Sequence, residues 1–506
     1  MDYKDVVAKI KDYYKEIYLL SHVQAILGWD QETYMPEAAI AERAEQAALL
    51  QSLIHKRRTS DELGRLLEEA GASSDRPAGA ESLSDTDAAI VRETYREYSR
   101  AIKLPEELVV RFAQVTSRAQ AVWQKARIED DFGLFAPVLS EIVDMVREMA
   151  SLYGYQEHPY DALLDEYEPY AKASDIKRIF DAVEAPIVEL VQRIGEINQV
   201  DDSFLHYKTD KEEQKRLSLA LLDKLGYDFK RGRLDVSAHP FTTTLGSDDV
   251  RITTRFLEDF LPSSIFGTIH EAGHALYEMG ISADLHGTIL ADGVSLGIHE
   301  SQSRFWENVI GRRRSFWQKN MQLISSAIPA LSDVSAESFY KAVNKVKPSF
   351  IRVEADEVTY ILHIILRFRL EMGMVDGSLE VNDLPDAWNQ QTKALLGIVP
   401  KKYSDGVLQD IHWSFGGIGY FPTYALGTLY ASQFAHAIEK ELGSIDELIA
   451  KDRLADILSW LRDKIHKYGK IYPADELCRR ATGESLNPEY FIKYIEGKYG
   501  DVYNLS

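Results

Sequence analysis

Two histidines and a glutamate have the types and spacing needed to bind a metal ion and activate water. His270, Glu271 and His274 form an H-E-x-x-H motif within residues 264–277. Apolar residues recur at helical spacing through this segment, at positions 265, 266, 269, 272, 276 and 277. On a helix the two imidazoles lie on one face and can reach one ion, with Glu271 beside a water bound to it. The motif therefore predicts a zinc hydrolase with Glu271 as its base, against the alternative of a chance match.

A catalytic zinc usually has three protein ligands and one open position for water, so the motif needs a third ligand. The class with a third histidine in the same segment is excluded, because Tyr277 and Gly280 stand where it requires glycine and histidine. Glu278 lies roughly 12 Å from His270 along a helix, which is too far to share an ion. The third ligand must therefore come from elsewhere in the chain.

Residues 297–308, further downstream, supply a carboxylate in a helix-like setting. A ligand from a second helix is the usual alternative when the motif's own helix supplies only two. Glu300 and His299 are both candidates, with Glu300 modestly favoured by spacing, and Glu307 is a weaker one. The spacing alone leaves the choice open.

Composition bounds the class of protein and its partners. The 506 residues are 45% hydrophobic, enough for a substantial core, and carry a formal net charge of -22. This charge argues against nucleic acid and against anionic membrane surfaces, and no apolar run is long enough to span a bilayer. Cys478 is the single cysteine, so no disulfide can form within the chain. Together with the charged first residues, this predicts a cytoplasmic protein.

Helices are expected to carry most of these residues, because apolar positions recur at helical spacing along much of the chain. A small, polar stretch at 71–80 reads as a surface loop, after which Ser84 or Asp85 could cap a helix. Pro105 is suited to the first position of another helix. The expected helices cover 5–26, 37–70 with a break near 57–60, 135–152, 174–198, 211–225, 335–346, 354–373, 425–442 and 453–467.

Residues 236–256 break the helical pattern directly before the metal-binding segment. Alternation from 250 to 256 and a turn-like sequence at 246–249 predict a β-hairpin. A strand edge beside a metal site could bind an extended peptide by backbone pairing. The alternative is a small sheet with no role in ligand binding.

Motifs spread along the chain resemble those of the Taq-type metallocarboxypeptidases, zinc enzymes similar to thermostable carboxypeptidase. Besides H-E-x-x-H, the similar segments are His239-Pro240-Phe241 (HPF), 249–253 (DxRxT), 299–302 (HES/GQ), 351–356 (IRxxAD) and 406–413 (GxxQDxHW). Residues 29–36, 160–167 and 482–484 also look like family segments. The resemblance spans nearly the whole chain in family order.

The resemblance implies a mainly α fold, a large helical gluzincin-type metallopeptidase with a deep cleft and a small β-hairpin or sheet beside the active site. It implies a single catalytic domain over residues 1–506, with an N-terminal helical portion at about 1–200 and a motif-bearing portion at about 230–430. It also implies a homodimer that removes single residues, with broad preference, from peptides with a free C-terminus. The resemblance further implies that Glu300 is the third ligand of one Zn²⁺ per chain. Co²⁺ or Mn²⁺ could occupy the same ligands.

The resemblance also suggests which residues assist the reaction. Gluzincin peptidases commonly use a downstream histidine and tyrosine to stabilise the oxyanion, which points to His412 and Tyr420, with Tyr424 as a second choice. Glu271 would accept the proton of the attacking water and pass it to the leaving amine. These roles are expectations for the structure to place.

An exopeptidase must also recognise a free carboxylate, which the planar fork of arginine suits. Arg352 is the first candidate because of its IRxxAD-like motif, and Arg251 is the second. The alternative for Arg352 is an ordinary ion pair with Glu354 or Asp356. Asp356 could instead accept a proton from a ligand imidazole, and we expect His239 to line the cleft.

Two rival functions remain. A helical zinc oligopeptidase or dipeptidyl carboxypeptidase would use the same metal ligands on different substrates. A helical binding or scaffold protein could retain a structural metal site without catalysis. Products of peptide digestion separate the first rival, and metal analysis separates the second.

Overall fold

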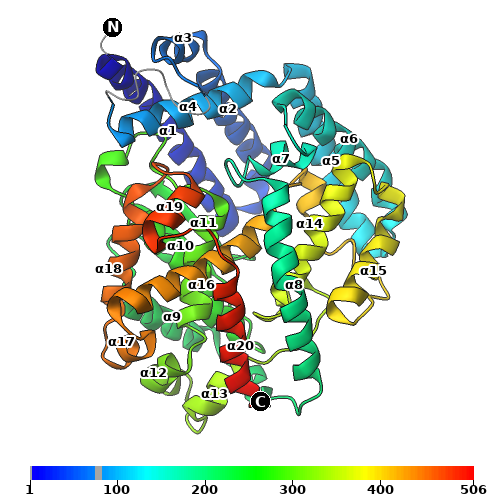
Figure 1. The fold of residues 1–506 in the computed structure, drawn as a ribbon, viewed down its shortest axis with the longest axis vertical. Coiled ribbons are helices and arrows are strands. Elements are labelled where there is room, and N and C mark those ends of the chain that lie inside the picture. The colour runs from blue at the N-terminus through cyan, green and yellow to red at the C-terminus, as the bar shows by residue number, and fades with distance from the viewer. Residues whose placement is uncertain (1–2, 74–82, 506) are drawn as a thin grey trace. The chain divides into compact units, whose positions relative to one another are not determined.

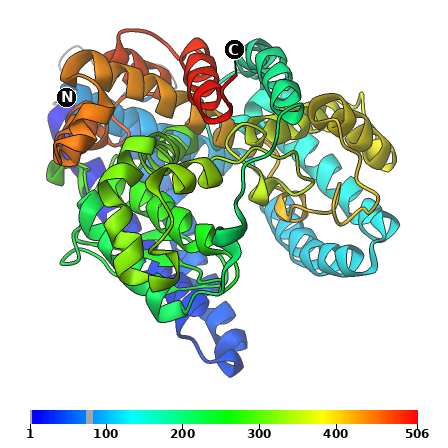
Figure 2. The same ribbon diagram turned by 90° about the horizontal axis from the view of Figure 1, so that it is seen from below.

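Helices dominate the protein in both views of this computed structural model, which describes residues 3–73 and 83–505 (Figure 1, Figure 2). The predicted mainly α class with a small sheet is confirmed. Of the loop expected at 71–80, residues 74–80 lie outside the described part. The chain forms two compact units: unit 1 is Met1–Ile102, Asp201–Val343 and Phe434–Ser485, and unit 2 is Lys103–Val200, Asn344–Gln433 and Leu486–Ser506.

Unit 1 begins with a long amphipathic helix, α1, which packs against α2 and α3. The expected break after α2 is confirmed, and the Ser60 hydroxyl caps α3 by accepting the Leu63 N–H. Ser84 caps the next helix in the same way, as predicted, by accepting the Asp87 N–H. The α-helices of unit 1 are α1 (Tyr3–Thr33), α2 (Ile40–Arg58), α3 (Asp61–Glu69), α4 (Asp85–Lys103), α9 (Lys211–Leu225), α10 (Leu261–Glu278), α11 (Leu296–Arg304), α12 (Arg314–Ala327), α13 (Ala336–Val343), α17 (Ile445–Ala450), α18 (Leu454–Lys464) and α19 (Ala474–Thr482).

A three-stranded sheet lies beside the metal-binding helix. The predicted hairpin is confirmed as β2 (Thr242–Gly246) and β3 (Asp249–Thr254), which pair antiparallel. A short strand that the alternation did not indicate, β1 (Leu234–Val236), pairs parallel to β3 on its other side. Helix α10 packs against β2 and β3, so the sheet supports the helix that carries the H-E-x-x-H motif.

Helices α10 and α11 approach each other closely at Gly273, inside the motif. A Cβ atom at this position would lie 2.5 Å from both the Gln302 carbonyl oxygen and the Ser303 Cα. Because such contacts are impossible, only glycine allows this approach. The Ser295 hydroxyl caps α11 by accepting the Ile298 N–H, which fixes where that helix starts. The result is a pair of helices whose facing side chains can meet.

Unit 2 is built around α14, which packs against α6, α7, α8 and α15. This helix begins at Tyr360, later than the predicted 354, because Asp356 accepts the N–H groups of Val358 and Thr359 and caps the turn before it. The α-helices of unit 2 are α5 (Glu106–Glu129), α6 (Phe132–Tyr153), α7 (Pro159–Leu164), α8 (Ala173–Gly195), α14 (Tyr360–Asp376), α15 (Leu384–Leu396) and α20 (Glu489–Tyr503), with α16 (Pro422–Leu442) contributing residues to both units.

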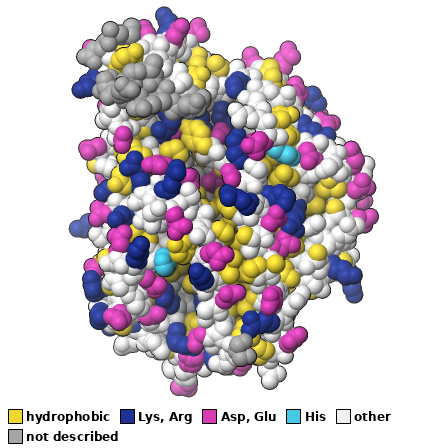
Figure 3. All heavy atoms as spheres, in the orientation of Figure 1, with side chains coloured by type: hydrophobic (Ala, Val, Ile, Leu, Met, Phe, Trp, Pro, Cys, Tyr) yellow, Lys and Arg dark blue, Asp and Glu magenta, His cyan; other side chains and the backbone are white. Residues whose placement is uncertain are grey.

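Charged side chains of both signs are interspersed with apolar ones on the face that Figure 3 shows. Within the residues that the structure describes, no helix is both long enough and apolar enough to cross a membrane. Cys478 is buried, and burial raises the pKa of its thiol to about 12, so nothing marks it as a reactive residue.

Candidate metal centre and arginine cluster

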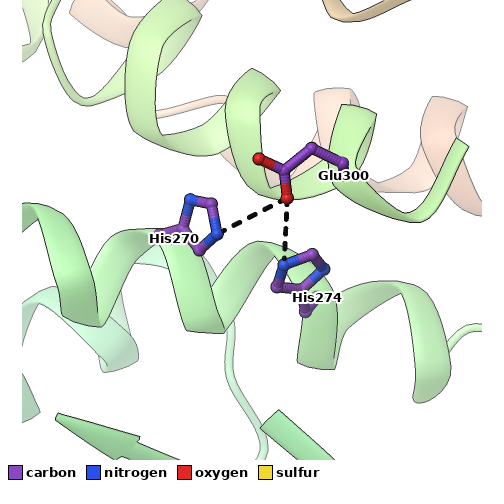
Figure 4. Close-up of side chains that lie close together, drawn as sticks. All are labelled: His270, His274 and Glu300. Carbon is purple, nitrogen blue, oxygen red and sulfur yellow. Dashed lines mark ion pairs between the residues drawn. The ribbon is translucent and has the colours of Figure 1, made fainter. Parts of the chain in front are cut away.

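His270 and His274 project from α10 toward Glu300 on α11 (Figure 4). The Glu300 Oε2 atom lies 3.6 Å from His270 Nε2 and 3.5 Å from His274 Nε2. All three ligand atoms lie within 4.8 Å of one another. Across residues 3–73 and 83–505, this is the one group of three or more such side chains close enough to hold a metal ion. The structure thus brings together the three residues expected as ligands.

These separations fit a shared ion better than direct hydrogen bonds. Nitrogen–oxygen hydrogen bonds have lengths of about 2.7–3.2 Å, shorter than both distances. Two atoms that each lie about 2.1 Å from one zinc at tetrahedral angles are about 3.4 Å apart. Two imidazole nitrogens and one carboxylate oxygen also match the ligand set of a catalytic zinc with an open position. The residues present therefore fit the metal that the motif predicts.

A π-helical turn after α11, η5 (Phe305–Ile310), brings Glu307 to His270. The His270 Nδ1–H donates to Glu307 Oε2 at 2.9 Å, which leaves the Nε2 lone pair directed at Glu300. The sequence suggests Glu307 only as a weaker candidate ligand and suggests Asp356 as the acceptor for a ligand imidazole. Asp356 instead accepts the N–H groups of Lys347, Val358 and Thr359. The carboxylate partner of His270 is therefore Glu307, which an ordinary helical spacing would have misplaced.

Two arginines balance the carboxylates of this cluster. Arg304 donates to Glu300 Oε1 at 2.7 Å and to Glu307 Oε2 at 3.2 Å, and Arg312 donates to Glu307 Oε1 at 3.1 Å. Burial alone would raise the pKa of both carboxyls, but Arg304 and His270 hold each pKa well below the usual range. His274 adds to the effect on Glu300, and Arg312 adds to the effect on Glu307. Both groups are therefore ionised at neutral pH, as a metal ligand and its support must be.

Glu271 occupies the position between the two histidines in the motif and is buried. Its Oε2 atom accepts a hydrogen bond of 2.7 Å from the Thr242 hydroxyl on β2. Burial raises the pKa of its carboxyl, although His270 and Thr242 oppose the shift. A carboxylate whose pKa is raised beside a metal site is suited to accept a proton from water.

His299 supports the cluster without joining it. Its ring stacks on that of His274, with centroids 4.5 Å apart, and its Nε2 lies 2.8 Å from Glu278 Oε1. Burial lowers the pKa of His274 to about 3, so this imidazole is neutral and can bind a metal. The sequence alone left His299 and Glu300 as alternative ligands. In the structure His299 makes a packing contact with His274, and Glu300 provides the oxygen that faces both His270 and His274.

The two other candidates in unit 1 lie in and beside the sheet. Arg251 on β3 donates to both oxygens of Asp249 at 2.8 and 2.7 Å, and its guanidinium lies 4.2 Å from the centre of the Trp29 ring. His239 precedes β2 and is exposed. Neither belongs to the metal-binding group.

Arg352 in unit 2 is buried and does not pair with Glu354 or Asp356. It donates through Nε and Nη2 to Asp410 Oδ1, at 3.0 and 2.8 Å, and through Nη1 to the Tyr360 hydroxyl at 3.0 Å. Arg367 donates to the other oxygen of Asp410 at 2.7 and 2.5 Å. Two positive groups thus share one carboxylate, so this buried cluster retains one net positive charge. Asp410 belonged to a recognised motif, whereas no sequence signal marked Arg367.

His412, Tyr420 and Tyr424 lie together beside this arginine cluster. The His412 ring centroid is 5.3 Å from that of Tyr420, and His412 Nε2 lies 3.4 Å from the Tyr424 hydroxyl. Burial lowers the pKa of His412 to about 4, with Arg352 and Arg367 adding to the effect, so the imidazole is neutral at pH 7. Its Nδ1 is buried with no hydrogen-bond partner among the described residues.

The helical fold and the His–His–Glu cluster define a metal-dependent hydrolase of the H-E-x-x-H class. The model of the carboxypeptidase Taq (M32) metallopeptidase family matches residues 9–499. The chain belongs to this family, as its motifs predicted, and is a metallocarboxypeptidase.

Similar proteins from several organisms match over nearly their full length. Thermostable carboxypeptidase 1 of Pyrococcus furiosus is 42% identical, over 98% of this chain and 98% of the relative. The protein of the same name from Thermus thermophilus is 43% identical, over 97% and 98%. Among solved structures, the M32 carboxypeptidase of Deinococcus radiodurans R1 is 36% identical with a TM-score of 0.95, covering 99% of this chain and 100% of that one.

Proposed function

We propose that the protein binds one Zn²⁺ through His270, His274 and Glu300 and hydrolyses single C-terminal residues from peptides with broad side-chain preference. The observation that carries this proposal is the meeting of two imidazole nitrogens and one buried carboxylate oxygen at separations that fit a shared ion. A bound zinc ion would polarise a water and the scissile carbonyl. Co²⁺ or Mn²⁺ could be held by the same ligands.

Glu271 is the proposed general base. Its buried carboxylate accepts a proton from the attacking water and then passes that proton to the leaving amine. Thr242 holds one carboxylate oxygen by a hydrogen bond of 2.7 Å, so the group keeps one orientation through both transfers. The raised pKa of Glu271 brings its proton affinity closer to that of the groups with which it exchanges the proton.

His412 or Tyr420 is the proposed donor to the oxyanion, with Tyr424 as the second choice. The neutral imidazole of His412 carries one N–H, and each phenol carries one O–H, so any of them can donate without prior loss of a proton. The proposal requires one of these donors to reach the reacting carbonyl during turnover. Removing such a donor typically costs about 3 kcal/mol of transition-state stabilisation.

Arg352 is the proposed receptor for the substrate's C-terminal carboxylate. It uses three of its five N–H groups on Asp410 and Tyr360, which leaves donors for a second anion. The net positive charge of the Arg352–Asp410–Arg367 cluster favours an anionic ligand. Arg251, the second candidate, has its fork engaged by Asp249. His239 remains a proposed lining residue near the substrate.

We propose further that the whole chain acts as one catalytic domain and that two chains form a homodimer in the cytoplasm. Each compact unit is assembled from three separate stretches, which argues against independent domains joined end to end. The single cysteine is consistent with a reducing compartment. The homodimer is inferred from the family resemblance, and light scattering tests it directly.

Mass spectrometry of a digested model peptide tests the function. The account expects a ladder of products that each lack one more C-terminal residue, and weak cleavage of the same peptide with an amidated C-terminus. Removing the metal with a chelator should abolish the ladder, and added Zn²⁺ should restore it. Internal fragments or released dipeptides would instead favour an oligopeptidase or dipeptidyl carboxypeptidase. No stoichiometric divalent metal in the purified protein would favour a binding protein.

A further inference from the structure

Helix α14 holds the segment 409–421 of unit 2 through two side chains one turn apart. Arg367 binds Asp410 at the start of the segment, as described above. Glu371, four residues further along α14, accepts hydrogen bonds from Trp413 and Gly419 within the same segment. Positions i and i+4 lie on one helix face, so α14 contacts this segment at three points. His412 and Tyr420 lie directly beside the two points that Glu371 holds.

Glu371 is completely buried, and every group that it contacts is a donor. Its Oε1 atom accepts the Trp413 Nε1–H at 2.9 Å. Its Oε2 atom accepts the Tyr160 hydroxyl of α7 at 2.7 Å and the Gly419 N–H at 3.0 Å. An ionised carboxylate satisfies all three donors, whereas a carboxylic acid can place its proton only on the Tyr160 phenol oxygen, which then no longer donates to Glu371. The site is therefore built for the charged form.

The backbone around Gly419 leaves this segment little freedom to move. Gly419 has φ +96°, a conformation that side chains other than glycine rarely adopt. A Cβ atom there would lie 2.9 Å from the Leu163 carbonyl carbon and 3.0 Å from the Leu164 nitrogen. The segment is thus pressed against the end of α7. The ring of the next residue, Tyr420, packs against the ring of Tyr167, with the two ring centroids 5.0 Å apart.

We propose that Glu371 is a positioning residue that holds the segment 409–421, and with it His412 and Tyr420, in the geometry that the reaction requires. The inference rests on the proposed roles of these two residues. Glu371 does not touch the substrate in this account. It acts through the hydrogen bonds to Trp413 and Gly419, which flank the two proposed donors in the sequence.

The charge state of Glu371 gives the inference a distinctive readout. Burial raises the pKa of its carboxyl to about 7, although Tyr160 of α7, Gly419, Trp413 and Arg367 of α14 all favour the charged form. Asp410 faces Arg367 and offsets part of its charge. Because protonation of Glu371 weakens the hydrogen bonds that hold Trp413 and Gly419, turnover should fall as the pH drops through the neutral range. Near neutral pH, Glu371 binds this proton only in the folded protein, because its pKa is raised there. The resulting stabilisation of the folded state is complete below the pKa that Glu371 has in the unfolded chain, and it is lost as the pH rises through 7.

The decisive variant is Glu371→Gln in the full-length, metal-loaded enzyme. Its amide presents an NH₂ group to at least one donor, so we expect kcat to fall at least about tenfold at pH 8 while KM and metal content change little. The pH dependence should be read directly from the indole N–H resonance of Trp413, assigned by its loss in Trp413→Phe. In the wild type this resonance should shift with a midpoint near 7, and in Glu371→Gln that shift should vanish. An unchanged kcat and an unchanged titration would overturn the proposal.

Tyr160→Phe provides a second variant that keeps Glu371 and its charge, in case Glu371→Gln does not fold. The variant loses a hydrogen-bond donor to the Glu371 carboxylate, which disfavours its charged form. The midpoint of the Trp413 titration and the fall of kcat at low pH should therefore both move upward by about one pH unit. Tyr499→Phe is the matched control, because it removes a buried tyrosine–glutamate hydrogen bond of 3.0 Å to Glu357 in the same unit. It should lower thermal stability and leave the kcat profile unchanged. Identical profiles for Tyr160→Phe and wild type would contradict the inference.

Failure of this inference can be told apart from failure of the proposed function. If His412→Ala and Tyr420→Phe both keep full turnover, the proposed donors are wrong, whatever Glu371 does. If either variant is impaired while Glu371→Gln retains wild-type kcat and pH profile, only the positioning role is overturned. A loss of kcat in all three, with metal content intact, supports both.

Discussion

The buried clusters of the two units carry opposite electrostatic designs. In unit 1 the carboxylates of Glu300 and Glu307 are balanced by Arg304 and Arg312, and the two imidazoles add no positive charge when they bind a metal. In unit 2 two arginines share a single carboxylate and leave a net positive charge. The first arrangement offers two neutral imidazoles and one carboxylate to a metal ion, and the second suits an anion. A carboxypeptidase needs both, because it must bind a catalytic metal and recognise a free carboxylate.

The carboxylates make the same contrast more locally. Arginines and imidazoles face Glu300 and Glu307 and hold the pKa of each well below its usual range. Only neutral donors hydrogen-bond to Glu371, and burial raises its pKa to about 7 although Arg367 opposes the shift. The type of partner, and not burial alone, therefore decides whether a buried carboxyl stays ionised. Variants in each cluster can show whether chemistry belongs to the first cluster and recognition to the second.

The largest effect is expected for Glu271→Gln. Glutamine keeps the size of the side chain but cannot accept a proton, so kcat should fall by about 10³-fold or more with the metal still bound. Turnover of a chromogenic peptide and elemental analysis of the same sample measure both quantities. Full activity with full metal content would remove Glu271 from its assigned role and leave the chemistry of unit 1 without a base.

The next effect tests whether unit 2 also takes part in the chemistry. Tyr420→Phe keeps the ring and its packing but removes the O–H, so loss of an oxyanion donor should lower kcat by about 10²-fold with KM nearly unchanged. Tyr424→Phe and His412→Ala, measured in parallel, show which of the three groups is the donor. If all three variants raise KM alone, unit 2 serves only in substrate recognition. The division of roles between the two units would then be stricter than we propose.

A smaller effect is expected for Glu307→Gln. The glutamine can still accept the His270 Nδ1–H but lacks the charge that Arg304 and Arg312 balance, so zinc affinity should fall about 10- to 100-fold. Competition with a chromogenic chelator measures the affinity without relying on activity. Glu337→Gln, which alters an ion pair with Arg314 in the same unit, is the control and should bind zinc normally. Equal affinities in the two variants would show that Glu307 does not support the ligand.

The metal centre could be predicted from sequence where the information is local. His270, Glu271 and His274 lie within one helical turn of each other, so their arrangement follows from helix geometry alone. The hairpin before them was visible in its alternation and its turn residues. Glu300 needed the family resemblance, because its approach to α10 depends on packing at Gly273 that no spacing rule expresses.

The remaining contacts could not be predicted, for reasons of distance and irregular geometry. The partner of Arg352 is Asp410, 58 residues away, while the two acids beside Arg352 in sequence do not bind it. Glu307 reaches His270 through a π-helical turn, which shifts the positions that a regular helix would assign. Glu371 gathers donors from three separate parts of the chain, and only a folded unit brings them together.

Our main proposal is that Arg352 recognises the C-terminal carboxylate of the peptide substrate. Its most direct test compares kcat/KM for one peptide with a free and with an amidated C-terminus, in the wild type and in Arg352→Met. The control is Arg369→Met, which removes a half-exposed arginine that pairs with Asp181 and Glu184 in the same unit. The account predicts that the wild type and the control prefer the free acid by about 10²-fold or more, and that Arg352→Met loses this preference while keeping its metal. A preference that survives in Arg352→Met would contradict it.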